Sequence, residues 1–178
     1  SRDTGFQGLA NYSLGDMGKV WAAFINQSRD TTANQSDITG YEAGAALNFG
    51  ALGLVGNYFS GEGLGTGVIG LGGADALGRE RDSQGYMLQA TYKVGNTKFG
   101  INYGVSSLDA TNNDTVNSFG AGLAGPAALA ANAAGILDEN EQLVLGVYHS
   151  LTPSLTLAGE YITNTMKFQR TSAAPVDA

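Results

Sequence analysis

Apolar and hydrophilic residues alternate along most of this 178-residue chain. In the segment KFGINYGVSSL, the residues Phe99, Ile101, Tyr103 and Val105 are apolar, and the residues between them are small or polar. Neighbouring side chains on a β-strand point to opposite faces, so this pattern predicts strands with one apolar and one hydrophilic face. Helical periodicity is nearly absent. The alternation therefore predicts an all-β fold.

The alternation divides into eight predicted strands, at about residues 4–14, 18–28, 38–49, 52–60, 83–94, 97–108, 140–151 and 155–168. Tight turns follow the odd strands, and the even strands are followed by long loops at about residues 29–37, 61–82 and 109–139. An antiparallel meander with short turns at one end and long loops at the other is typical of an outer-membrane β-barrel, whose turns are periplasmic and whose loops are extracellular. The predicted fold class is therefore all-β, an antiparallel transmembrane β-barrel.

Aromatic residues on the predicted apolar faces lie near strand ends, as in the aromatic girdles that flank the apolar band of membrane barrels. They are Phe6, Tyr12, Tyr41, Phe49, Tyr86 and Tyr92. The strand at residues 18–28 has no clear apolar face, because two sets of residues compete for it. These sets are Trp21, Ala23 and Ile25, against Val20, Ala22 and Phe24.

Charged residues within the clearest strands fall on the hydrophilic face. A Lys or Arg that faces lipid costs about 2–4 kcal/mol at the bilayer midplane, so this face is expected to line the barrel interior. The predicted pore-lining residues are Glu42, Asn48, Asn57, Gln89, Lys93, Lys98, Asn102 and Glu160. They either set the field of an aqueous channel or are generic residues of a wetted wall, and the sequence leaves both interpretations open.

The composition excludes several classes of function. The net charge of −7 and the pI near 4.4 argue against nucleic-acid binding, which needs clustered Lys and Arg. The absence of cysteine excludes disulfides, thiolate metal sites and thiol nucleophiles. The single histidine, His149, and its neighbour Ser150 point to opposite faces of a strand, so they cannot form a catalytic dyad. We therefore expect a structural histidine near the periplasmic rim, no enzymatic activity and no cofactor.

Residues 65–70, GTGVIG, formally match the dinucleotide-binding fingerprint G-x-G-x-x-G. That fingerprint needs a buried parallel strand before it and a helix that begins at the glycines. The preceding strand alternates instead, and the following residues are too rich in glycine for a helix. The acidic residues Glu80 and Asp82 have the spacing of the ribose ligand but open the next strand. We therefore interpret the motif as part of a flexible extracellular loop.

Two other loop features invite a functional interpretation. Arg79 and Arg81, with Glu80 and Asp82, are expected to form a solvated or lipopolysaccharide-facing charge cluster rather than a substrate site. Residues 121–137 lie in the third long loop and could form a short helix after Pro126 that covers the pore mouth, although an ordinary surface loop is the favoured interpretation.

The direction of the strands bears on the size of the barrel. If the short turns are periplasmic, both ends of the chain lie outside the cell, whereas bacterial barrels have an even strand number and normally keep both termini in the periplasm. A membrane-spanning barrel must also close, because an open edge leaves unpaired backbone groups in hydrocarbon. We therefore expect one strand before Ser1 and another after Ala178, in a larger barrel.

Four segments resemble a known family: GFQGLANYSLGDMGKVWAAFINQ, YEAGAALNFGALGLVGNYFSGEGLG, RERDSQGYMLQATYKVGNTKFGINYGVSSLD and ENEQLVLGVYHSLTPSLTLAGEYITN. They are similar to the C-terminal half of general Gram-negative porins, particularly those of proteobacteria outside the enteric group. The resemblance implies a 16-stranded outer-membrane porin that forms a homotrimer, lies among outer-membrane lipid and lipopolysaccharide, and passes small hydrophilic solutes and ions. The family's inward-folded constriction loop and its closing strand with a C-terminal aromatic residue are not visible. Ion selectivity and pore size therefore stay open.

The expected function is passive diffusion through a polar channel whose charges bias which ions enter. A small structural or adhesive eight-stranded barrel is the first alternative, and it would have an interior plugged by side chains. Small residues on the hydrophilic face favour a wide, watery lumen instead: Gly44, Ala46, Gly85, Gly100 and Gly104. A soluble, lipocalin-like carrier is the second alternative, and it would need apolar side chains inside and polar ones outside.

Overall fold

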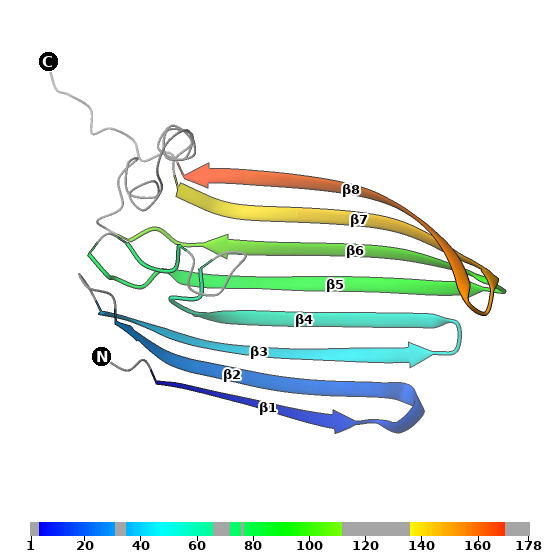
Figure 1. Cartoon of the computed structure of the whole chain (residues 1–178), viewed down its shortest axis with the longest axis horizontal. Coiled ribbons are helices and arrows are strands. Elements are labelled where there is room, and N and C mark those ends of the chain that lie inside the picture. Colours follow the sequence, from blue (N-terminus) through cyan, green and yellow to red (C-terminus); the bar gives the residue numbers. More distant parts are fainter. Residues whose placement is uncertain (1–3, 31–34, 66–71, 76, 112–135, 170–178) are drawn as a thin grey trace, which may run out of the picture.

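The computed structural model describes residues 4–30, 35–65, 72–75, 77–111 and 136–169. Within these ranges, eight strands and one short 3-10 helix follow one another along the chain: β1 (Gly5–Ser13), η1 (Gly15–Met17), β2 (Gly18–Asp30), β3 (Gln35–Phe49), β4 (Leu52–Glu62), β5 (Asp82–Val94), β6 (Thr97–Leu108), β7 (Ile136–Thr152) and β8 (Leu155–Gln169). Each strand pairs antiparallel with the next, so the strands form a single sheet in the order β1 to β8 (Figure 1). The predicted all-β antiparallel fold is confirmed.

The register of the strands divides their side chains into two sets, because cross-strand partners lie on the same face of a sheet. Glu42 pairs with Ala23 on β2 and with Phe59 on β4, and Phe59 pairs with Gly85 on β5. We call the face that carries Glu42 the hydrophilic face, since polar, charged and small residues dominate it, and the opposite one the apolar face. Large exposed side chains of the apolar face include Phe6, Tyr12, Phe24, Tyr41, Phe49, Tyr58, Tyr86, Leu88, Tyr92, Phe99, Ile101 and Leu145.

The register also settles the orientation of β2, which alternation alone left undecided. Val20 pairs with Tyr12 on β1 and with Ala45 on β3. Val20 and Phe24 therefore belong to the apolar face, and Trp21 belongs to the hydrophilic face. The neighbouring strands decide this orientation because the local sequence offers an apolar set on either side.

Several strands continue beyond the alternating pattern at their loop ends. β7 begins at Ile136 and has 17 residues, and β2 extends to Asp30. At about 3.3 Å per residue β7 is roughly 56 Å long, whereas a tilted strand needs only about 9–11 residues to cross a bilayer. The loop ends of these strands are thus longer than the apolar band requires. Within the described residues, no helix has the length and hydropathy needed to cross a membrane.

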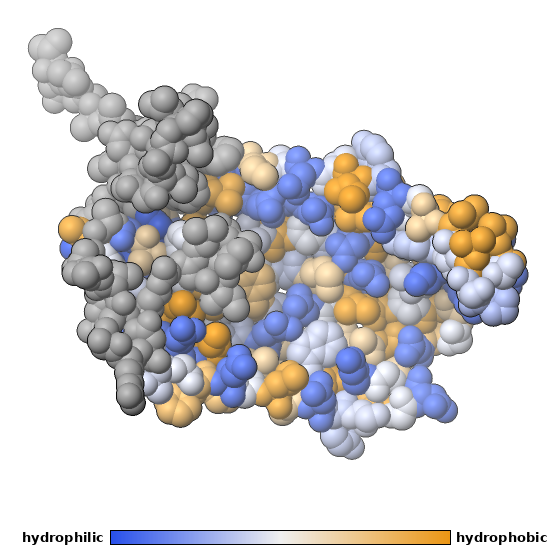
Figure 2. Space-filling model, viewed as in Figure 1, coloured by the Kyte–Doolittle hydropathy of each residue, from blue (hydrophilic) through white to orange (hydrophobic). Residues whose placement is uncertain are grey.

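The sheet is a single layer with very little conventional core. Among the described residues, Ile38 and Leu108 are the buried hydrophobic side chains, whereas Phe6, Leu9 and Tyr12 are each at least 65% exposed. Figure 2 shows one face of the sheet, on which hydrophilic residues are spread among hydrophobic ones. A soluble protein rarely leaves so much apolar surface uncovered, so this surface needs a nonaqueous partner.

The sheet curves around its hydrophilic face. Gln7 on β1, Glu42 on β3 and Ser106 on β6 all line one hollow, although four strands separate the first and last of them. The concave side is therefore the hydrophilic one. This arrangement is the reverse of a lipocalin-like carrier, so that alternative is wrong.

Candidate functional site

The residues that the sequence marks as pore-lining lie on the hydrophilic face of the sheet. Gln89 and Asn102 are cross-strand partners, as are Lys93 and Lys98 beside the turn between β5 and β6. The full set comes from five strands: Glu42 and Asn48 from β3, Asn57 from β4, Gln89 and Lys93 from β5, Lys98 and Asn102 from β6, and Glu160 from β8. Each is exposed or half-buried, so all eight side chains are accessible to solvent.

Aromatic donors hold both carboxylates of this set. Trp21 Nε1 donates to Glu42 Oε1 at 2.7 Å, and the Tyr148 hydroxyl donates to Glu160 Oε1. A lysine Nζ lies near each ring, and that of Lys98 is 5.0 Å from the centre of the Tyr148 ring. The sequence analysis missed these aromatic partners. Their positions on the hydrophilic face of β2 and β7 are the only sequence signal that could have indicated them.

Two aromatic rings of the hydrophilic face, those of Trp21 and Phe59, lie over glycines of the neighbouring strands. A Cβ atom added at Gly44 would overlap the Trp21 ring, and one added at Gly85 would come within 2.5 Å of the Phe59 ring. Each glycine is the cross-strand partner of the residue whose ring covers it. Glycine therefore lets a large ring rest on the wall and leaves the space in front of the wall open.

The connection between β4 and β5 folds back over the hydrophilic face. We call residues 63–81 the inward loop, of which the structure describes 63–65, 72–75 and 77–81. Leu64 lies so close to this face that a Cβ atom at Gly40 or Gly61 would come within 2.8 Å of its methyl groups. The loop thus occupies space on the concave side of the sheet.

Arg81 is buried inside the inward loop, with only 2% of its surface exposed. Its Nη1 donates to the carbonyl oxygens of Gly72 at 2.7 Å and Ala74 at 2.8 Å. The expectation that this arginine belongs to a solvated or lipopolysaccharide-facing cluster is therefore wrong. The carbonyl acceptors of the loop compensate the burial of this charge. The local sequence RERD contains no pattern that predicts these contacts.

Asp75 forms a second anchor of the inward loop. Its Oδ1 accepts from the backbone N–H groups of Leu77 and Arg79, and its Oδ2 accepts from Thr111 Oγ1 at 2.7 Å. Burial alone would raise the pKa of this carboxyl, but the three hydrogen bonds and the charge of Arg79 outweigh it and lower the pKa below 3.8. Glu80 ties the same loop to β3, since its Oε1 accepts from the Asp37 backbone N–H at 2.8 Å.

The three remaining predictions concern the GTGVIG motif, His149 and the loop helix at 121–137. Gly65, the first residue of GTGVIG, is buried and has a φ of 70°, and residues 66–71 lie outside the described residues. Gly63 and Gly73, on either side of the motif, are also buried. His149 Nδ1 is 2.9 Å from Thr97 Oγ1, near a tight turn. Of the predicted loop helix at 121–137, residues 121–135 also lie outside the described residues, and β7 begins at Ile136.

The described residues contain no group of three or more His, Asp or Glu side chains placed to hold a metal ion. The geometry is that of a wall: a curved antiparallel sheet, accessible polar side chains on its concave face and exposed apolar ones outside. A model of the Gram-negative porin family matches residues 1–167. The chain belongs to the Gram-negative porin family.

A solved structure supports the same fold for this porin. The anion-selective porin from Comamonas acidovorans superposes with a TM-score of 0.63 at 18% sequence identity, over 92% of this chain and 39% of the other. This chain thus spans about two-fifths of that porin. No curated protein matches the sequence. Gram-negative porins are non-enzymatic channel proteins of the bacterial outer membrane, and that membrane is the location of this one.

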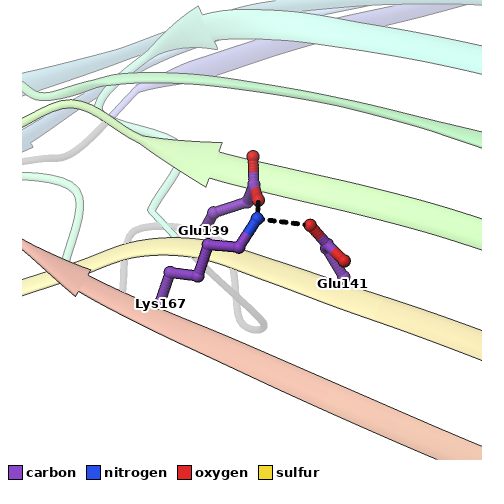
Figure 3. Close-up of polar contacts among 3 residues, drawn as sticks. All are labelled: Glu139, Glu141 and Lys167. Carbon is purple, nitrogen blue, oxygen red and sulfur yellow. Dashed lines mark hydrogen bonds and ion pairs between the residues drawn. The ribbon is translucent and has the colours of Figure 1, made fainter.

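One charged cluster of this porin lies on the apolar face, where the sequence analysis expected none. Lys167 Nζ on β8 lies 2.5 Å from both Glu139 Oε1 and Glu141 Oε1 on β7 (Figure 3). Glu141 pairs with Val105, which in turn pairs with Tyr86, so the cluster lies level with aromatic residues at the loop end. Because β7 is longer than the apolar band requires, we expect these charges to lie where the bilayer meets water.

Proposed function

We propose that this porin forms a water-filled channel through which small hydrophilic solutes and ions diffuse passively. The observation that carries the proposal is the chemical difference between the two faces of one curved sheet. Accessible Lys, Glu, Gln and Asn side chains occupy the concave face, and exposed aromatic and aliphatic side chains occupy the convex one. Water in the lumen would solvate the polar side chains of the concave face, and lipid would contact the apolar side chains of the convex face.

The proposed lumen-lining residues are the eight that share the hydrophilic face: Glu42, Asn48, Asn57, Gln89, Lys93, Lys98, Asn102 and Glu160. They stabilise hydrated solutes through hydrogen bonds, and their charges bias which ions enter. The rings of Trp21 and Phe59 lie over Gly44 on β3 and Gly85 on β5, and we expect this arrangement to keep the lumen wide there. The inward loop narrows it at the end where the long loops lie, at about residues 29–37, 61–82 and 109–139, which we place outside the cell.

We further propose that the sheet is part of a 16-stranded barrel. β1 and β8 are its edges among the described strands, and unpaired edges in hydrocarbon are costly, so further strands are expected to close it. A homotrimer is the proposed assembly, since porins are generally trimeric. The convex face would contact outer-membrane lipid, and the loop ends would contact lipopolysaccharide. No enzymatic activity, cofactor or nucleic-acid partner is proposed.

Single-channel recording of the full-length protein in a planar bilayer tests the proposal. Discrete ohmic openings in KCl are expected. A bilayer that stays silent while the protein is demonstrably inserted would contradict the channel and would support a structural or adhesive barrel. A charge-neutralised variant, Lys93→Gln with Lys98→Gln, is the matched control, since it should leave opening intact and change only ion preference.

A further inference from the structure

A hollow of about 680 Å³ lies on the hydrophilic face beneath Leu64 of the inward loop. Its wall includes four large apolar residues from separate elements: Leu9 from β1, Ile25 from β2, Phe59 from β4 and Leu64 itself. Leu9 is 65% exposed on a face that is otherwise mostly polar. The volume is within the range of about 300–1,000 Å³ that small-molecule pockets occupy.

Uncovered apolar surface of this kind favours contact with an apolar group. Each Å² removed from water contributes roughly 25 cal/mol, so a short hydrocarbon chain seated against Leu9, Ile25, Phe59 and Leu64 would be held in a site otherwise filled by water. A purely hydrophilic solute would gain nothing there. The apolar wall therefore selects solutes that carry a hydrocarbon body.

Among the described residues that line this hollow, Glu42 is the one that carries a charge. Its Oε1 accepts from Trp21 Nε1 at 2.7 Å, which fixes the carboxylate in place without neutralising it. The lysines of the same face, Lys93 and Lys98, lie beside the turn between β5 and β6 and do not line the hollow. A fixed carboxylate beside an apolar wall attracts a cationic head and disfavours an anionic one.

We propose that this hollow is a binding subsite for small organic cations with an apolar body, of which a primary alkylammonium ion is the simplest. The ammonium group would meet Glu42, and the hydrocarbon chain would lie against Phe59 and Leu64 beneath the inward loop. The subsite rests on the proposed function in one respect, since a solute reaches it from the lumen.

Hexylammonium is the probe, and the full-length protein is used in two assays. In planar bilayers at constant KCl, hexylammonium should reduce the current reversibly and with saturation. In detergent micelles it should change the emission of Trp21, the only tryptophan of the chain, identified by subtracting the spectrum of a Trp21→Phe variant. The fluorescence assay does not require conduction, so a silent bilayer would refute the proposed channel while the subsite is still judged.

The variants separate the subsite from general attraction of cations. Glu42→Gln should weaken hexylammonium binding about tenfold, whereas the matched variant Glu160→Gln should change it by less than about twofold. Glu160 is a suitable control because it is a carboxylate of the same face, also held by an aromatic donor, and does not line the hollow. Leu64→Ser should weaken binding of hexylammonium and leave that of methylammonium unchanged.

Three results would overturn the proposal. The first is equal binding of hexylammonium and methylammonium, which would show that the apolar wall has no role. The second is an equal loss in Glu42→Gln and Glu160→Gln, which would show only a diffuse field. The third is equal binding of hexanoate, which would show that the carboxylate does not select for charge.

Discussion

The two ends of the hydrophilic face are built differently. At the turn end, Lys93 and Lys98 stand exposed on strands joined by a tight turn, and their positions follow from strand periodicity alone. At the loop end, Arg81 and Asp75 are buried in the inward loop and held by hydrogen bonds. The alternation of residues along each strand thus determines which side chains line the wall. Contacts between segments far apart in the sequence determine how the inward loop lies over it.

The largest expected effect comes from removing the buried arginine of the inward loop. Arg81→Ala deletes two charge-assisted hydrogen bonds and leaves the carbonyls of Gly72 and Ala74 unpaired, which should destabilise the loop by roughly 3–6 kcal/mol. Protease cleavage within the loop should accelerate and channel conductance should rise. Arg79→Lys, which keeps the charge beside Asp75, is the control and should have a much smaller effect. Equal effects of the two variants would contradict the description of the anchor.

The second effect tests the wall itself with adjacent positions of β6. Ile101→Lys places a charge on the apolar face and should destabilise the folded protein in lipid by about 2–4 kcal/mol. Asn102→Lys places the same charge on the hydrophilic face and should be tolerated. Denaturant unfolding in lipid vesicles measures both. A tolerated lysine at Ile101 would show that this face does not meet lipid.

The third effect concerns the pH dependence of the inward loop. The pKa of Asp75 is lowered in the folded protein, so its contribution to stability is fully present above about pH 3.8 and is lost as the pH falls through the lowered value. Thr111→Val removes one of its hydrogen bonds and should cost about 1.5 kcal/mol, with loop opening displaced to higher pH. Conductance recorded from pH 6 downward follows this opening. Opening at an unchanged pH in the variant would contradict the role of Thr111.

The smallest effect belongs to the exposed lysines at the turn end. Replacing Lys93 and Lys98 with glutamine should move the reversal potential of the channel toward cation preference. The permeability ratio should change by about twofold or less at 0.1 M salt, because charges there are screened within about 10 Å. A larger shift of the reversal potential at low salt would support the placement of Lys93 and Lys98 in the lumen. A shift toward anion preference would contradict this placement.

The sequence predicted the strands and their faces because both follow from local periodicity. Trp21 could not be oriented in this way, since both faces of its segment are apolar and only pairing with β1 and β3 decides between them. The contacts of Asp75 with Thr111 and of Glu80 with Asp37 join segments 36 and 43 residues apart, which no spacing rule anticipates.

The charged cluster of Glu139, Glu141 and Lys167 escaped prediction for a different reason. The predicted strands at 140–151 and 155–168 already contain Glu141 and Lys167, both at outward positions of the alternation. The pairing of Glu139 with Lys167 joins two strands, so periodicity within one strand does not indicate it. We expect the outward face to meet headgroups and water at this level, where charges are stable.

A channel wall of this kind requires adjacent side chains of β6 to point to opposite faces of the sheet. The chain contains no cysteine, so single cysteines at positions 101 and 102 can be compared directly in native outer membranes. A charged, membrane-impermeant thiol reagent should modify Asn102→Cys rapidly and reduce its conductance, and it should leave Ile101→Cys unmodified. Rapid modification of Ile101→Cys with protection of Asn102→Cys would contradict the channel wall described for this porin.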